Sequence, residues 1–148
     1  MRVVLDTNIL LSALMVRGTP PDRLYEEWRH GRFELVSTER QIEELKQVVR
    51  RPFFQGRIKT SEVGRMINDI RRLAVMCSSL PTVNRSPDPN DDYLLALCQA
   101  THADYLITGD KSHLLALDRH EGTRIVSARA MVTLLDKKSP AQNGIGWR

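Results

Sequence analysis

The sequence predicts a three-layer α/β/α sandwich, in which helices cover both faces of a central parallel sheet of about four to five strands. Short apolar segments at residues 3–5, 33–36, 105–108 and 124–126 alternate along the chain with segments of helical period. Residues 3–5 read Val-Val-Leu, an apolar run typical of a strand that is buried on both faces. Strands that alternate with helices form parallel sheets between helical layers, so this alternation predicts the fold class.

The helices are predicted from their apolar periodicity and from local start signals. Pro20 suits the first turn of a helix, with Thr19 as its N-cap. Thr38 and Gln41 have the spacing of a capping box at the start of another helix. Residues 74–77 either continue the preceding helix or form a short strand, because periodicity does not distinguish the two. The expected helices cover residues 8–14, 20–28, 38–49, 60–73, 89–100, 111–117 and 128–135.

Length and composition indicate one domain over residues 1–136, followed by a flexible C-terminal tail at 137–148. The net charge of +4 is compatible with an anionic partner such as a nucleic acid. No apolar run approaches the roughly 20 residues of a membrane-spanning helix, and the first residues lack the pattern of a signal peptide. We therefore expect a cytoplasmic protein that does not associate with membranes.

Two aspartates follow predicted strands at the same edge of the sheet. Asp6 comes directly after the strand at 3–5, and Asp110 follows the strand at 105–108 by one glycine. Right-handed crossovers place the carboxyl ends of parallel strands at one edge, where open α/β sheets bind their ligands. Asp6 and Asp110 are therefore expected to lie close together when their strands are neighbours in the sheet.

Helical geometry brings further acids toward this edge. At about 100° per residue, Glu44 lies on the flank of its helix's apolar face, and Glu43 points to solvent. In a later helix, Asp91 shares a face with apolar residues three and four positions on, whereas Asp92 is turned about 100° away toward the rim. Glu44 and one or both of these aspartates are thus candidates for a shared site.

Each acid also has a purely structural interpretation. Asp6 and Asp110 can cap the helices that follow them, and Asp88 is interpreted as an N-cap rather than as a ligand. Glu44 can be a solvated residue, and the later aspartates can serve only the helix dipole. These interpretations do not explain why the acids converge on one edge. Clustered carboxylates repel one another unless a cation joins them, and Mg²⁺ or Mn²⁺ accepts carboxylate oxygens, so the sequence predicts a metal site.

Four segments of the chain, in this order, resemble the motifs of the PIN domain family. Together they span the chain from residue 2 to about 135. The four segments are Val3–Leu10, Glu44–Pro52, Asp88–Leu97 and Ala103–Lys111. The resemblance extends to the VapC-like ribonucleases, which are toxin components of toxin–antitoxin pairs. It implies a PIN-like fold and a Mg²⁺- or Mn²⁺-dependent endoribonuclease that cleaves single-stranded or structured RNA.

The resemblance also implies roles for individual residues and partners. The implied catalytic acids are Asp6, Glu44, Asp91 and Asp110. The implied metal ligands are Asp6, Asp91, Asp92 and Asp110, and helix geometry favours Asp91 over Asp92 as the third acid. Asn8 is expected to support the first acid, and Thr108 to lie beside the fourth. Members of such families form homodimers, and their toxins are held inactive by a small antitoxin protein.

Basic residues in the middle of the chain are candidates for substrate contacts. Arg50, Arg51, Arg57 and Lys59 can bind RNA phosphates, and a solvated basic face is the alternative. The alternative function for the whole chain is a non-catalytic RNA- or protein-binding module on the same fold. Because every acidic position of the four motifs is filled, the sequence favours the enzyme.

Overall fold

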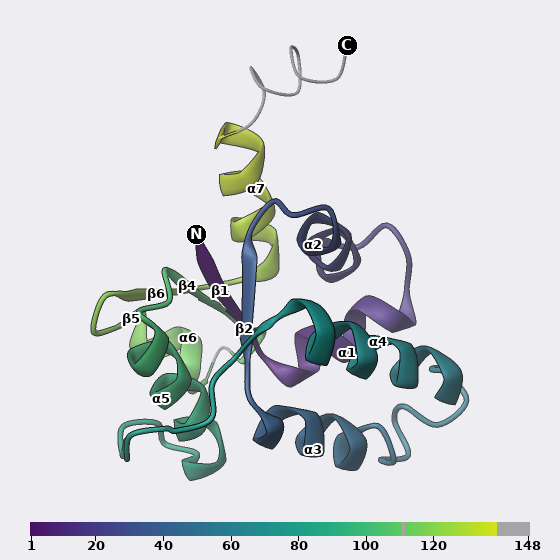
Figure 1. The fold of residues 1–148 in the computed structure, drawn as a ribbon, viewed down its shortest axis with the longest axis horizontal. Helices are drawn as coiled ribbons and strands as arrows, with labels where there is room; N and C mark the ends of the chain where they lie inside the picture. Colours follow the sequence, from purple (N-terminus) through teal and green to yellow (C-terminus); the bar gives the residue numbers. More distant parts are fainter. Residues whose placement is uncertain (111, 139–148) are drawn as a thin grey trace.

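A computed structural model describes residues 1–110 and 112–138 of the chain. It confirms the predicted α/β class, because a six-stranded sheet lies between layers of helices (Figure 1). The strand order is β3-β2-β1-β4-β6-β5, and all neighbours are parallel except β5 and β6. The strands are β1 (Arg2–Leu5), β2 (Glu34–Ser37), β3 (Val75–Met76), β4 (Tyr105–Ile107), β5 (Arg119–His120) and β6 (Thr123–Val126).

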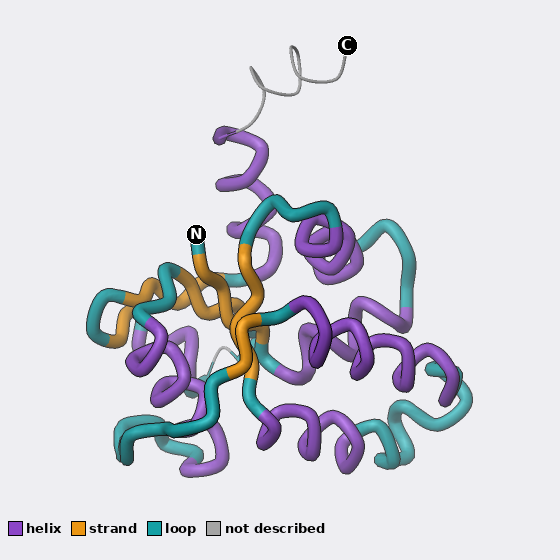
Figure 2. Tube along the Cα trace, viewed as in Figure 1, coloured by secondary structure: helices purple, strands orange, loops and turns teal. Residues whose placement is uncertain are grey.

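The helices divide between the two faces of the sheet. Side chains of α1, α2, α3, α4 and α7 share one buried cluster with the sheet, and those of α5 and α6 share a second cluster. In Figures 1 and 2, α1 to α4 lie to the right of β2, whereas α5 and α6 lie to its left, below β4, β5 and β6. The helices are α1 (Thr7–Met15), α2 (Pro20–Arg29), α3 (Glu39–Val48), α4 (Thr60–Leu73), α5 (Asp92–Thr101), α6 (Leu114–Leu117) and α7 (Ala128–Lys138), with a 3₁₀ turn, η1 (Pro89–Asp91).

Strand β1 is central because its side chains are apolar on both faces. Val3 and Leu5 belong to the cluster beneath α1 to α4, whereas Val4 belongs to the cluster beneath α5 and α6. Such alternation is what a strand buried on both faces requires. In the ladder between β1 and β4, Leu5 lies opposite Ile107. The residues that follow these two strands therefore emerge side by side at one edge of the sheet.

The sheet has one strand more than the sequence predicted. Residues 75–76 form a short strand, which decides between the two possibilities for residues 74–77. The additional strand is β5, which makes an antiparallel hairpin with β6 through a turn at Glu121, where φ is 51°. A strand of two residues carries no apolar alternation, so the pattern that identified the longer strands could not reveal it.

The start of α3 differs from the predicted capping box. Thr38 is the N-cap residue, but its side chain makes no capping hydrogen bond. The side chain of Gln41 is buried instead, where its Nε2 donates to the Leu5 carbonyl at 2.6 Å and its Oε1 accepts from Ser37 Oγ at 2.6 Å. These bonds fasten α3 to the carboxyl ends of β1 and β2, so Gln41 helps to place the rest of α3 beside β1.

Helix α7 continues to Lys138, two residues beyond the predicted end of the domain at residue 136. The remainder of the predicted flexible tail, residues 139–148, lies outside the described residues. Cys77 and Cys98 are both free thiols. Within residues 1–110 and 112–138, no helix combines the length and the apolar character that crossing a membrane requires.

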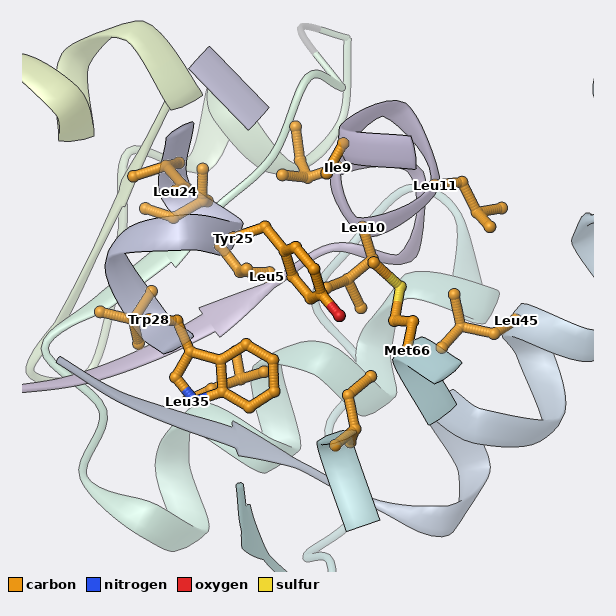
Figure 3. Close-up of a cluster of buried hydrophobic side chains, with 14 of the residues drawn as sticks. Leu5, Ile9, Leu10, Leu11, Leu24, Tyr25, Trp28, Leu35, Leu45 and Met66 are labelled. Carbon is orange, nitrogen blue, oxygen red and sulfur yellow. The ribbon is translucent and has the colours of Figure 1, made fainter. Parts of the chain in front are cut away.

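The larger buried cluster joins α1 to the sheet and to four other helices. Leu10 of α1 is fully buried in this cluster, together with Leu5 of β1 and Met66 of α4 (Figure 3). Close packing of this kind makes the loss of even a few methyl groups costly, since the surrounding side chains refill the space only in part.

We expect Leu10→Ala to lower the free energy of unfolding by about 2–5 kcal/mol, because it leaves a cavity in the packed cluster. Equilibrium unfolding in urea measures this change. The matched control is Leu73→Ala, since Leu73 is 51% exposed at the end of α4. That variant should differ from the wild type by no more than about 0.5 kcal/mol. Equal losses in both variants would contradict the assignment of Leu10 to the core.

Candidate functional site

The predicted acids meet in a pocket at the carboxyl end of β1 and β4. We call it the acidic pocket, and its volume is about 510 Å³. The acids that line it are Asp6, Glu43, Glu44, Asp88, Asp91 and Asp110. Its other lining residues are Thr7, Asn8, Arg40, Gln47, Val48, Arg51 and Asn90. The four predicted catalytic acids are therefore brought together, although their roles as catalysts or ligands stay predictions.

Asp6 lies at the base of the acidic pocket and is only 7% exposed. Its Oδ2 accepts a hydrogen bond from Thr108 Oγ1 at 2.7 Å, and its Oδ1 accepts from the Asn8 backbone N–H at 3.4 Å. Asp6 is thus the N-cap of α1 as well as a pocket residue, so the structural interpretation and the functional one are compatible. Burial raises the pKa of Asp6, and the nearby Glu44 and Asp110 carboxylates raise this pKa further.

Asn8 and Thr108, the two residues predicted to support the acids, make different contacts with them. Thr108 is fully buried and connects two acids, because its hydroxyl donates to Asp6 and accepts from the Asp110 backbone N–H at 3.0 Å. Asn8 contacts Asp6 through its backbone N–H, while the residue itself is exposed and lines the pocket. Thr108 therefore fixes the relative positions of Asp6 and Asp110.

Glu44 is held by two hydroxyl groups that the sequence analysis did not single out. Its Oε1 accepts hydrogen bonds from Thr7 Oγ1 and from the Tyr93 hydroxyl. Thr7 and Tyr93 also lie within hydrogen-bonding distance of each other, at 3.3 Å. Thr7 directly follows Asp6 and Tyr93 directly follows Asp92, so their adjacency to motif acids was the available signal. The two hydroxyls orient Glu44 without neutralising its charge.

The structure separates Asp91 from Asp92. Asp91 lines the acidic pocket as the last residue of η1. Asp92 is buried, and its Oδ1 accepts hydrogen bonds from the backbone N–H groups of Arg85 at 3.1 Å and Ser86 at 2.7 Å. The predicted position of Asp92 at the pocket rim is therefore wrong, because its carboxylate is used to hold the loop that precedes η1. Asp91 remains the candidate third acid.

His113 is a further member of the site that the sequence analysis missed. Its backbone N–H donates to Asp110 Oδ1 at 3.1 Å, and its Nδ1 lies 3.0 Å from Asp110 Oδ2. One potential ligand atom from each of Asp88, Asp91 and His113 falls within 4.8 Å of the others, a spacing that one metal ion can bridge. Asp88 also caps η1 by accepting from the Asn90 N–H at 3.0 Å, as predicted. The spacing of His113 three residues after Asp110 was the only sequence signal.

The acidic pocket has an excess of negative charge. In the described part of the chain, no lysine or arginine forms an ion pair with Asp6, Glu44 or Asp91. Partial burial, together with the Asp6, Asp88 and Asp110 carboxylates, raises the pKa of Asp91 to about 7. Hydrogen bonding between the Asp91 and Asp110 carboxyl groups adds a smaller upward contribution to this pKa. A divalent cation would relieve this repulsion, and the donor set of carboxylate oxygens fits Mg²⁺ or Mn²⁺.

The residues predicted to bind RNA are not gathered in one pocket. Arg51 lines the acidic pocket, whereas Arg50 lines a separate pocket between α3 and α4. Lys59 lines a third pocket beside α2 and α4, and the Arg57 guanidinium lies over the Phe53 ring, 4.6 Å from its centroid. Of these four residues, only Arg51 lines the acidic pocket, and RNA binding by all four stays a prediction.

The raised pKa of Asp91 predicts how the stability of the metal-free protein depends on pH. A protonated Asp91 stabilises the fold below about pH 4, and this contribution is lost as the pH rises through about 7. Asp91→Asn should therefore be more stable than the wild type at pH 8 in EDTA, but not at pH 4. Thermal unfolding monitored by circular dichroism measures the difference, and an equal effect at both pH values would contradict it.

The comparisons with known proteins agree with this geometry. Residues 2–112 match the family model described as PIN domain, and no curated protein matches the chain. The matched segment contains every strand and helix that contributes to the acidic pocket, from β1 to the loop after β4. The match covers well over half of the chain, and the chain therefore belongs to the PIN domain family, whose members are generally nucleases that use divalent metals.

Proposed function

We propose that this protein is a Mg²⁺- or Mn²⁺-dependent endoribonuclease. The observation that carries the proposal is the convergence of Asp6, Glu44, Asp91 and Asp110 on one pocket, where none of them forms an ion pair with a lysine or arginine among the described residues. Such an arrangement is unfavourable in the isolated protein and becomes favourable when a divalent cation is present. It fits phosphodiester hydrolysis, in which a cation and an anionic substrate meet.

The residues have distinct proposed roles. Asp6, Asp91 and Asp110 would hold the metal ion, and His113 and Asp88 lie where they can complete its coordination. When bound, a divalent ion supplies positive charge that activates water and stabilises a phosphodiester's leaving oxygen. Glu44 is oriented by Thr7 and Tyr93, which suits a residue that accepts a proton from the attacking water. Thr108 acts as a positioning residue for Asp6 and Asp110.

The biological setting is part of the same proposal. The four motifs resemble those of VapC-like ribonucleases. This resemblance supports a role for the protein as the toxin of a type II toxin–antitoxin pair, which a small antitoxin protein holds inactive. It also supports the proposal that the protein is a cytoplasmic homodimer and acts on single-stranded or structured RNA. The basic net charge of +4 agrees with a polyanionic substrate.

We expect Asp6→Asn to abolish RNA cleavage, because it removes one charge from the metal site while keeping the side chain's size. The assay is cleavage of a mixed single-stranded RNA pool with Mg²⁺, with Mn²⁺ and with EDTA. Asp69→Asn would test charge loss in a buried aspartate outside the pocket, and circular dichroism would verify the fold of both variants. Metal-dependent cleavage that survives Asp6→Asn would contradict the proposed site. Metal binding without cleavage of any RNA would favour the non-catalytic module.

Asp91→Asn and Asp92→Asn should behave differently even though the residues are neighbours. Asp91→Asn removes a proposed ligand, so Mn²⁺ affinity should fall by at least about tenfold. Asp92→Asn keeps an oxygen that can accept from the Arg85 and Ser86 N–H groups, so Mn²⁺ affinity should change little. Isothermal titration with Mn²⁺ measures both. A larger loss in Asp92→Asn than in Asp91→Asn would reverse the assignment.

Thr108→Val should weaken metal binding without removing any ligand. Valine has nearly the shape of threonine but cannot donate to Asp6 or accept from the Asp110 N–H. We expect Mn²⁺ affinity to fall by about 10- to 100-fold, as for other residues that orient metal ligands. Thr108→Ser restores the hydroxyl and should recover most of the affinity, and failure to do so would indicate a packing defect instead.

A further inference from the structure

A second hollow lies beside the acidic pocket and shares a wall with it. We call it the side pocket, and its volume is about 330 Å³, within the roughly 300–1,000 Å³ of small-molecule sites. Residues 80–84, Arg40, Pro89, Asp92, Tyr93 and Ala96 line it. Arg40 lines both pockets and therefore forms part of the boundary between them. A ligand that occupied both would have to pass Arg40.

Arg40 is held at this boundary by an aromatic ring. Its guanidinium carbon lies 4.7 Å from the centroid of the Tyr93 ring, whose hydroxyl donates to Glu44. Within the described residues, Arg40 has no carboxylate partner in an ion pair. A guanidinium that is stacked on a ring and not neutralised retains donors for phosphate and a plane on which a nucleobase can stack. Arg40 is thus suited to a nucleotide rather than to a cation.

The lining of the side pocket differs in character from that of the acidic pocket. Leu80, Pro81, Val83 and Pro89 supply apolar surface, and Thr82 and Asn84 supply polar groups. Apolar surface covers the face of a nucleobase, while amide and hydroxyl groups bind its edge. The acidic pocket, in contrast, has six acidic side chains in its lining, whereas the lining of the side pocket has one, Asp92. The two neighbouring pockets therefore match the two parts of a nucleotide, its base and its phosphate.

The loop that forms the side pocket is fixed at both ends. At its start, the Cys77 N–H donates to the Ser37 carbonyl at 2.9 Å and extends the β2–β3 ladder. At its end, Asp92 holds the Arg85 and Ser86 N–H groups, and Arg85 Nη1 donates to the Arg119 carbonyl at 2.6 Å. A wall held in this way needs little ordering when a ligand binds, which favours affinity.

We infer that the side pocket binds a nucleobase of single-stranded RNA, from a nucleotide next to the phosphate in the acidic pocket. This inference rests on the proposed ribonuclease function, and it adds a base-binding subsite to it. Arg40 would contact the strand where it passes from one pocket to the other. A base paired in a duplex has no free face to enter the pocket, so the subsite selects unpaired RNA.

The test uses the Asp6→Asn variant of this chain with Mg²⁺, so that RNA is not cleaved during the measurement. The probes are a fluorescent single-stranded RNA of about ten nucleotides, a ribose–phosphate strand of equal length without bases, and the same RNA in a duplex. Fluorescence anisotropy gives each affinity. We expect the RNA to bind on the order of tenfold more tightly than the strand without bases, as one stacked base contributes.

Two further substitutions test whether the preference for RNA over the base-free strand arises in the side pocket. Arg40→Ala and Val83→Ala should each bring the affinity ratio of RNA to base-free strand close to one, and Val83→Ala should leave the affinity for the base-free strand unchanged. The matched control is Arg29→Ala, because the Arg29 guanidinium also lies over an aromatic ring, at 5.7 Å from the Tyr25 centroid, but lines neither the acidic pocket nor the side pocket. It should keep the ratio of the parent protein.

Three results would overturn the inference: equal affinity for the RNA and the base-free strand, equal losses of affinity for both strands in Arg40→Ala, or equal affinity for single-stranded and duplex RNA.

Cleavage by the wild-type protein is measured separately with Mg²⁺ and Mn²⁺. Cleavage without a base preference overturns the subsite and leaves the ribonuclease function intact. A base preference without cleavage supports the subsite and counts against the enzymatic function.

Discussion

Burial of the Asp6 carboxylate is the constraint on which the rest of the site depends. A charged carboxylate that is 7% exposed loses most of its hydration, and two hydrogen bonds replace only part of it. The neighbouring carboxylates add repulsion, so burial and charge both raise the pKa of Asp6. The fold tolerates this group because the surrounding packing is extensive. A cation in the pocket would offset the unfavourable free energy of burying the Asp6 charge, and this relief would strengthen cation binding.

The sheet topology brings the acids together through local connections. Asp6 and Asp110 follow adjacent strands, and the shared hydroxyl of Thr108 sets the spacing between them. Glu44 comes from α3, which Gln41 fastens to the end of β1. Asp6 and Asp110 thus lie within three residues of a strand end, and Glu44 lies inside helix α3. Such placement on regular elements gives a site more precise geometry than placement on free loops would.

The sequence predicted the fold class and the convergence of Asp6, Glu44, Asp91 and Asp110, because both follow from strand and helix periodicity. The run Val3-Val4-Leu5 and the acid after it identify a buried strand and its ligand edge. The two-residue strand β5 was missed, since so short a segment has no pattern. The part played by Gln41 was predicted wrongly, because its capping-box spacing is equally compatible with a buried side chain that bonds Leu5 and Ser37.

The distinction between Asp91 and Asp92 required the structure. Ideal helical angles placed Asp92 at the pocket rim, but η1 ends at Asp91 and α5 begins at Asp92, so one regular helix does not describe both residues. The hydroxyl groups of Thr7 and Tyr93 that contact Glu44 are separated from it by 37 and 49 positions in the sequence. Contacts between such distant positions depend on tertiary packing, which a single sequence does not reveal.

The short outer strands have a consequence for the behaviour of the protein at high concentration. Both ends of the sheet are closed by strands of two residues, β3 and β5, and β5 reverses the direction of the sheet. An outer strand of this length exposes few unpaired backbone groups, so it offers a poor template for strand addition by another molecule. Self-association through continuous intermolecular sheets is therefore disfavoured, and the chain can retain a strongly apolar parallel core without the aggregation that long exposed edges would promote.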